Sequence, residues 1–431
     1  MSKGHTIPIL HLSRLILDHG CQVTLFTTPS GDDITIIDLP FPADIPGIQT
    51  GIESTDKLPS MSLFLPFTRA TKLMQPYFEK TLQTLRHVTC IVSDQSLHWT
   101  VESATKLGIP RLGFFGMSNY ANALSRDAAV NGLLSLHESV DEPFNLTSFP
   151  WIKLTRNDFD DPFNKRDPSG PLFDFIIETV IAMSNSYGLL VNSFYELEPL
   201  YVDYCNRESK PKAFCVGPLC LTRLPIMEPV LHQERRWIQW LDQKLAQGNP
   251  VLYVAFGSEI ARGLEESNVS FLWVVRKSGI ELGYEFEDRI KERGMVVREW
   301  VDQKQILEHE IVQGFLSHCG WNSVLESLCA EVPILAWPMM AEQLLNAKMV
   351  VEEIKIGLRV EAVNRSGNKF VEAESLKNKV KELMEGEKGD EVRKKVKEVA
   401  ESARNSMKEG GSSWKTLNEL IKEIHLKNGT G

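Results

Sequence analysis

Residues that could bind an anion gather in the segment HCGWNS, which contains His318, Gly320, Asn322 and Ser323. An apolar run at residues 311–316 precedes it and apolar residues at helical spacing follow it, so we expect a strand, a tight turn at Gly320 and a helix capped by Asn322 or Ser323. A helix that begins at the carboxyl end of a parallel strand offers free N–H donors and a partial positive charge. With His318 and the hydroxyl of Ser323 as further donors, the turn predicts a phosphate or pyrophosphate site. A capped helix with a hydrogen-bonded histidine explains the same residues, and the turn alone favours that simpler interpretation.

Two other residues, His5 and Asp94, could perform acid–base chemistry. His5 follows Gly4 just before an amphipathic helix predicted at residues 7–17, and Asp94 follows an apolar strand predicted at residues 90–92. A carboxylate that holds one ring nitrogen of a histidine leaves the other nitrogen to accept a proton. A lone histidine in a loop is more often structural, and an aspartate after a strand often caps a helix. The two residues alone therefore leave both interpretations open.

The elements that must position these residues alternate along the chain. Short β-rich runs are separated by helical patterns, which predicts an α/β protein with parallel sheets and helices on both faces. The predicted strands are residues 23–26, 90–92, 188–191, 251–256, 271–275, 312–316 and 333–336. Residues 23–27 and 34–39 both resemble strands, but the link between them is shorter than a parallel crossover requires. We expect an antiparallel hairpin there, or else residues are missing.

Length and composition limit the function classes. The chain has 431 residues, which predicts two domains, and its net charge of −10 does not favour nucleic acid as a partner. The seven cysteines form no C-x-x-C pair, so we expect reduced thiols and a cytoplasmic protein. No signal peptide or membrane-spanning stretch is expected. No metal-ligand cluster stands out, so we expect no metal ion or other cofactor.

The segment from Trp300 to Gln343 decides between these alternatives. It reads WVDQKQILEHEIVQGFLSHCGWNSVLESLCAEVPILAWPMMAEQ and closely resembles the signature box of plant family 1 glycosyltransferases, which use UDP-sugars. Further matches lie in MSKGHTIP, LLVNSFYELEP, VGPL, WLDQK and VLYVAFGS, and cover nearly the whole chain. The resemblance implies a GT-B fold, in which two Rossmann-like domains face each other across a cleft. We expect an acceptor-binding domain at 1–220, a linker at 221–236, a UDP-sugar-binding domain at 237–408 and a C-terminal helix at 409–431 that packs back on the first domain.

The resemblance also implies roles for individual residues in donor binding. Trp300, with Val301 beside it, would stack on uracil, Gln303 would help to hold the nucleoside, and Glu326 would accept hydrogen bonds from the ribose. The diphosphate would lie against four residues of the turn and against a second strand end: His318, Gly320, Asn322, Ser323 and Gly257–Ser258. Trp321, Glu342 and Gln343 would line the sugar. Many family members carry Asp where this chain has Glu342, whereas the closing glutamine, Gln343, is associated with glucose.

On the acceptor side, the resemblance implies that His5 is the general base and that Asp94 orients it. The acceptor oxygen would attack the anomeric carbon from the face opposite UDP and invert its configuration. Ser118 is expected to approach the sugar. Residues 59–67 and 114–120 are expected to line a site for a flat apolar acceptor, although core packing explains their apolar content equally well.

We therefore expect a monomeric enzyme that transfers glucose from UDP-glucose to a flavonoid or another phenol. Family members begin with a strand that leads into the Gly-His pair, and only three residues precede Gly4. The alternatives are an impaired or non-catalytic UDP-sugar-binding protein and a GT-B nucleotide-sugar epimerase.

Overall fold

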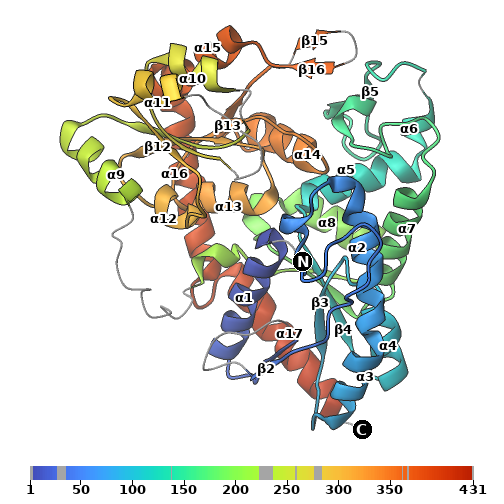
Figure 1. Ribbon diagram of the computed structural model, residues 1–431. Helices are drawn as coiled ribbons and strands as arrows, with labels where there is room; N and C mark the ends of the chain where they lie inside the picture. The colour runs from blue at the N-terminus through green and yellow to red at the C-terminus, as the bar shows by residue number, and fades with distance from the viewer. Residues whose placement is uncertain are drawn as a thin grey trace. The chain divides into compact units, whose positions relative to one another are not determined.

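The computed structural model describes residues 3–26, 35–136, 138–222, 236–257, 260–275, 284–361, 363–365 and 368–429. These residues form two compact units, Met1–Met227 with Asn405–Gly431 and Glu228–Arg404. The predicted domains, 1–220 and 237–408, end close to these boundaries, whereas most of the predicted linker lies outside the described residues. Figure 1 shows that each unit contains strands with helices around them.

The first unit is built on a parallel sheet in which the strand order is β3-β4-β7-β8. These strands are Ile91–Asp94, Arg111–Phe115, Gly188–Val191 and Ala213–Cys215. Two smaller sheets pair β1 (Thr24–Phe26) with β2 (Thr35–Ile37), and β5 (Phe144–Asn145) with β6 (Lys153–Leu154). Since β1 and β2 run parallel, the expected antiparallel hairpin is wrong. Phe26 packs edge-on against Phe78 and so ties β1 to the helix α3.

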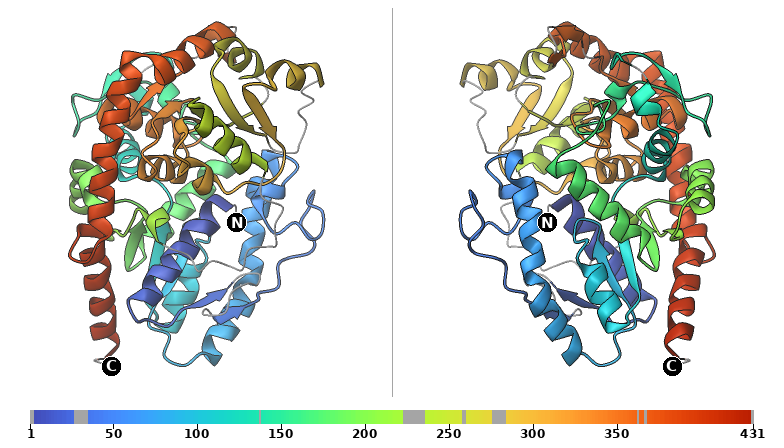
Figure 2. Two further views of the ribbon diagram at one scale, coloured as in Figure 1. Left: turned by 90° about the vertical axis from the view of Figure 1, so that its left-hand side faces the viewer. Right: turned by 90° about the vertical axis from the view of Figure 1, so that its right-hand side faces the viewer.

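The helices of the first unit cover this sheet. They are α1 (Lys3–Asp18), α2 (Phe64–Ala70), α3 (Gln75–Thr84), α4 (Thr100–Leu107), α5 (Asn119–Val130), α6 (Leu133–Leu136), α7 (Pro171–Ser184), α8 (Pro199–Glu208) and α17 (Ser412–Gly429). Short 3-10 turns include η1 (Thr55–Lys57), η2 (Met61–Leu63) and η3 (Thr71–Met74). The C-terminal helix α17, red in Figure 2, inserts Leu417 and Leu420 into a core cluster with Leu12 of α1 and Phe214 of β8. The last helix of the chain therefore completes the core of the first unit.

The second unit contains a six-stranded parallel sheet in the order β11-β10-β9-β12-β13-β14. Its strands are β9 (Val251–Ala255), β10 (Ser270–Val274), β11 (Gly294–Val297), β12 (Val312–Ser317), β13 (Ile334–Ala336) and β14 (Gly357–Arg359). Val251 and Tyr253 belong to one core cluster, whereas Leu252 and Val254 belong to the other, so this apolar strand is buried on both faces. The order reverses between β9 and β12, which is where open parallel sheets usually bind ligands.

The remaining elements cover this second sheet. They are α9 (Arg236–Gln247), α10 (Ala261–Ser267), α11 (Tyr284–Ile290), α12 (Gln303–Leu307), α13 (Trp321–Cys329), α14 (Gln343–Lys348), the π-helical turn Met349–Glu353, α15 (Ala373–Glu385), α16 (Glu387–Met407) and the antiparallel pair β15 (Val363–Arg365) and β16 (Asn368–Phe370). The seven predicted strands are all present within two residues of their expected ends, and the α/β class with parallel sheets is confirmed.

Candidate active site

The turn after β12 lies at the carboxyl edge of the second sheet, beside the end of β9. Cys319 adopts the left-handed conformation, with φ of 63°, whereas Gly320 has an ordinary φ of −58°. The prediction that Gly320 makes the tight turn is therefore wrong, and the glycine serves a different purpose. A Cβ atom at Gly320 would lie 2.7 Å from Nε2 of His318, so a larger residue here would displace that imidazole from its present position.

The helix α13 begins directly after this turn. Its N-cap is Gly320, and no side chain caps it, so the predicted cap by Asn322 or Ser323 is wrong. Because the helix starts earlier than predicted, Ser323 lies in its first turn, and its Oγ accepts a hydrogen bond from Nε2 of Gln303 at 3.0 Å. The N-terminus of α13 therefore lies at the carboxyl edge of the sheet, a position at which anions commonly bind.

Gln303, the first residue of α12, connects this turn to Glu326. Its Nε2 also donates to Oε2 of Glu326 at 2.6 Å, and its Oε1 accepts from the hydroxyl of Tyr253 at 3.4 Å. Burial raises the pKa of Glu326, and the hydrogen bond from Gln303 partly offsets that effect. The site thus holds a partly buried carboxylate that is suited to accept hydrogen bonds from hydroxyl donors. The sequence did not single out Tyr253, which is 1% exposed and stacks on Phe315.

The predicted base-binding residues differ sharply in exposure. Trp300 follows β11 at the same sheet edge and is 60% exposed, so its indole face is accessible. Val301 is 7% exposed and packs in a core cluster, so its side chain cannot contact a base and only its backbone can serve. Gly257 follows β9, and Ser258 lies outside the described residues.

Among the predicted sugar-lining residues, Glu342 and Gln343 are partly exposed at the start of α14. Oε1 of Gln343 accepts from the backbone N–H groups of Met339 and Met340, each at 3.1 Å, which directs Nε2 away from the backbone. Trp321 is only 2% exposed, because its ring lies in the interior at the first turn of α13. Its indole face therefore does not line a site within this unit.

The first unit brings together the two residues that were predicted to perform acid–base chemistry. Nδ1 of His5 lies 2.6 Å from Oδ2 of Asp94, and Oδ1 of Asp94 accepts from the backbone N–H of Ser96 at 2.8 Å. The His5 side chain is 33% exposed and that of Asp94 only 1%. Burial alone would raise the pKa of Asp94, but the charge of His5 and the hydrogen bonds from His5 and Ser96 outweigh it and hold the pKa below its ordinary value. A buried carboxylate is thus kept ionised against one ring nitrogen.

The local setting of both residues corrects the sequence interpretation. His5 lies in the first turn of α1 rather than in a loop, because the helix begins at Lys3, whose backbone N–H donates to Asp56 at 2.6 Å. Asp94 does not cap a helix, because α4 begins only at Thr100.

Several of the predicted acceptor-lining residues belong to the core. Ser118 is fully buried and caps α5 by accepting from the backbone N–H of Ala121 at 3.0 Å, so its hydroxyl does not face a ligand in this unit. Phe67, Phe114 and Tyr120 are also buried, as the core-packing alternative requires, whereas Met61 is 59% exposed.

Comparison with known proteins identifies the family. The chain is 51% identical to UDP-glycosyltransferase 90A1 of Arabidopsis thaliana over 455 residues, which cover 98% of this chain and 95% of that protein. The chain belongs to the plant UDP-glycosyltransferases. It is also 33% identical to UDP-glucose flavonoid 3-O-glucosyltransferase 7 of Fragaria ananassa over 468 residues, covering 99% of this chain and 94% of that one. The family model described as UDP-glucoronosyl and UDP-glucosyl transferase matches residues 255–398, which contain the whole signature box from Trp300 to Gln343.

Solved structures agree with this assignment. The crystal structure of Glycyrrhiza uralensis UGT73P12 complexed with glycyrrhetinic acid 3-O-monoglucuronide has a TM-score of 0.87 and 31% identity, covering 99% of this chain and 94% of that one. The GT-B fold class is therefore confirmed, and this UDP-glycosyltransferase is an enzyme that transfers a glycosyl group. Among the residues that the structure describes, no helix has both the length and the apolar character needed to span a membrane.

Proposed function

We propose that this UDP-glycosyltransferase moves glucose from UDP-glucose to a hydroxyl group of a small apolar acceptor such as a flavonoid or another phenol, with inversion at the anomeric carbon. The observation that carries the proposal is the 2.6 Å contact between His5 and the buried carboxylate of Asp94. A histidine held in this way has the arrangement of a general base, because the carboxylate fixes the tautomer and stabilises the imidazolium that forms.

In the proposed reaction, Nε2 of His5 takes the proton of the acceptor hydroxyl while Asp94 holds Nδ1. The acceptor oxygen then forms a bond to the anomeric carbon as the bond from that carbon to UDP breaks, and the bonding electrons leave with the diphosphate. Such base catalysis typically contributes about 10²–10⁴-fold to the rate. Attack from the face opposite the leaving group inverts the configuration.

On the donor side, the N–H groups of the first turn of α13 and the imidazole of His318 would hold the diphosphate and stabilise the charge on departing UDP. Trp300 would stack on uracil with its exposed face. Hydrogen bonds from the ribose hydroxyls would stabilise the ionised form of Glu326, which burial disfavours. We propose that no metal ion or other cofactor takes part.

Glucose as the transferred sugar is supported by Gln343, whose Nε2 is directed away from the backbone and is a suitable donor to a sugar hydroxyl. A flavonoid or similar acceptor is supported by the similarity to UDP-glucose flavonoid 3-O-glucosyltransferase 7 of Fragaria ananassa. All seven cysteines carry free thiols, which supports a reducing compartment such as the cytoplasm. We propose that the enzyme acts there as a monomer.

The test is incubation with UDP-glucose labelled in the sugar and a panel of phenols and flavonoids. We expect labelled glucoside and free UDP in equal amounts, with β configuration from the α-linked donor. Conversion of the labelled donor into another UDP-sugar would instead indicate an epimerase. Tight binding of UDP-glucose without turnover on any acceptor would indicate a binding protein, and either result would refute the proposal.

A further inference from the structure

A buried arginine lies behind the His5–Asp94 pair. Arg111 begins β4, the strand that pairs with β3, and is only 2% exposed. Its Nε donates to the hydroxyls of Ser93 and Thr100, each at 2.9 Å. Its Nη1 donates to the hydroxyl of Ser186, and its Nη2 lies 3.4 Å from the backbone carbonyl oxygen of Asp94. The guanidinium therefore ties the end of β3 to the start of α4 and the end of α7.

The acceptors of Arg111 are all uncharged, although the guanidinium carries a full positive charge in the interior. Burial lowers the pKa of Arg111 to about 10, and the negative charge of Asp94 acts in the opposite direction. A buried charge is costly unless an opposite charge compensates it. Asp94, itself 1% exposed, is the group in the described residues that supplies this compensation.

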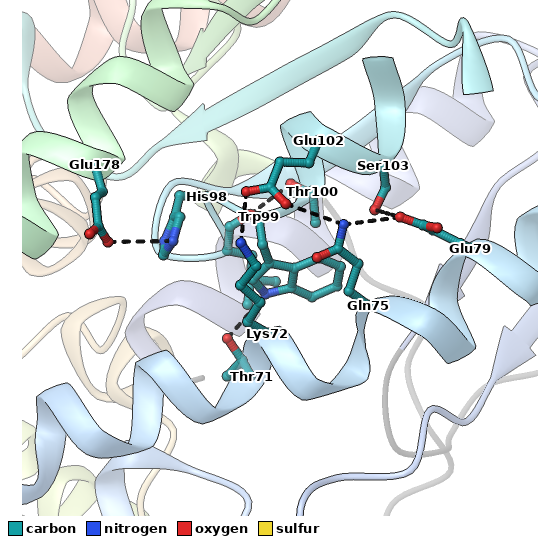
Figure 3. A network of polar contacts seen from close by, with 11 residues as sticks. Thr71, Lys72, Gln75, Glu79, His98, Trp99, Thr100, Glu102, Ser103 and Glu178 are labelled. Atoms are coloured by element: carbon teal, nitrogen blue, oxygen red, sulfur yellow. Dashed lines mark hydrogen bonds and ion pairs between the residues drawn. The ribbon is translucent and has the colours of Figure 1, made fainter. Parts of the chain in front are cut away.

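Several charged groups on the surrounding segments form ion pairs of their own. Figure 3 shows two of these contacts, Lys72 with Glu102 and His98 with Glu178, beside Trp99, whose indole N–H donates to Thr71. The pairs are Lys72–Glu102 at 2.8 Å, Lys106–Glu79 at 2.5 Å, and Glu178 with His98 at 3.8 Å and with Arg69 at 3.9 Å. On α1, Arg14 forms an ion pair with Asp18. Burial lowers the pKa of Lys3, and the negative charge of Asp56 acts in the opposite direction.

We infer that Arg111 is a positioning residue of the catalytic pair: its hydrogen bonds fix the end of β3, and its positive charge, which interacts with the carboxylate of Asp94, opposes a second positive charge on His5. The inference rests on the proposed role of His5 as base. Two cations that share one carboxylate compete for it, so Arg111 keeps more of His5 neutral, and thus able to accept a proton, at neutral pH. The buried charge of Arg111 would then contribute to catalysis and not to folding alone.

Removing this charge should change how His5 titrates. In Arg111→Gln the amide can still reach the hydroxyls of Ser93 and Thr100, but the cation is gone. Protonation of His5 then becomes easier, so the acidic limb of the kcat/KM profile should move to higher pH by about half a unit or more. The same shift should appear when the carbon-bound ring protons of His5 are titrated by NMR, a readout that does not require turnover.

Two further variants distinguish the effect of the Arg111 charge on His5 from a purely structural effect of changing a buried side chain. Ser186→Asp leaves Arg111 in place but gives it a second carboxylate, so the acidic limb of the kcat/KM profile should again move to higher pH. This variant tests the inference even if Arg111→Gln does not fold. Arg156→Gln is the control, because Arg156 is 4% exposed in the same unit and donates to the backbone oxygen of Glu138 at 2.6 Å, away from the pair. Arg156→Gln should leave the acidic limb of the kcat/KM profile at the same pH as in the parent protein.

An upward shift of the His5 titration in Arg111→Gln or Ser186→Asp, without one in Arg156→Gln, is the expected result. A fall in kcat or in thermal stability with the His5 titration unchanged would overturn the inference and leave Arg111 a structural residue. If the parent protein transferred no glucose, the proposed function would fail, and the NMR titration would still decide whether Arg111 opposes protonation of His5.

Discussion

Gln303 and Glu326 are joined by a hydrogen bond of 2.6 Å from Nε2 to Oε2. The two residues come from the first turn of α12 and from the interior of α13, and Tyr253 of β9 holds the other end of the glutamine amide. Three separate elements thus orient one carboxylate, which suits a group that must meet two adjacent hydroxyls at once. We propose that this arrangement partly preorganises the donor site.

Glu326→Gln should weaken UDP binding while stabilising the protein without ligand. Burial raises the pKa of Glu326 in the folded state, so its ionisation costs stability as pH rises above its ordinary value of about 4.3. The unfolding midpoint of the variant should exceed that of the parent at pH 7 and equal it below about pH 4. Calorimetry in both conditions, with and without UDP, measures the two effects. Glu398→Gln, an exposed change on α16, is the control and should alter neither the UDP affinity nor the unfolding midpoint. A lower unfolding midpoint for Glu326→Gln than for the parent at pH 7 would contradict this account.

Trp300→Ala should reduce UDP affinity and leave folding unchanged, because the indole is 60% exposed. An aromatic contact is worth about 0.5–1.5 kcal/mol beyond area burial, so the affinity should fall by about 2- to 12-fold. Isothermal titration with UDP measures this directly. The similarly exposed Trp151 of the first unit offers the matched control, Trp151→Ala. Equal UDP affinity in the two variants would rule out stacking on Trp300.

The sequence predicted the parts of the fold that repeat a local pattern and missed those that depend on contacts between distant segments. The run at β9 alternates between two buried faces and was recognised, whereas β4 begins with the charged Arg111 and contains Gly113, so it does not resemble a buried strand. A Cβ atom at Gly113 would lie 2.5 Å from the sulfur of Met183, so the methionine packs closely against this glycine.

The candidate site shows the same division. The donor box and the His5–Asp94 pair could be predicted from a family resemblance, but the partners Tyr253 and Arg111 could not, because strand pairing alone brings them to the site. The turn at His318 was assigned to the wrong residue, since Cys319 adopts a conformation that sequence patterns usually reserve for glycine.

Gln343→His should increase the use of UDP-galactose relative to UDP-glucose. The imidazole lacks the amide geometry with which Gln343 accepts from Met339 and Met340, so the donor offered to the sugar changes position. The ratio of kcat/KM for the two donors is the measurement, and Gln247→His on the surface of α9 is the control. A ratio that stays constant would assign sugar choice to other residues, with Glu342 the first to examine.

Removing divalent cations should not change the rate. The proposed mechanism stabilises departing UDP with the first turn of α13 and with His318, so no step requires a metal ion. Glucosylation of a phenol should proceed equally with excess EDTA and with added Mg²⁺. Loss of turnover in EDTA that Mg²⁺ or Mn²⁺ restores would show that the diphosphate is neutralised by a metal instead.

The most direct test of the central claim is single-turnover glucosylation by His5→Ala, measured together with its UDP affinity. Loss of the base should reduce the rate by about 10²-fold or more, and UDP affinity should stay within twofold of the parent because the donor residues belong to the other unit. Asp94→Asn should show a smaller loss of the same kind, and His425→Ala, an exposed histidine on α17, should show none. Parental turnover in His5→Ala would contradict the assignment of His5 as the catalytic base.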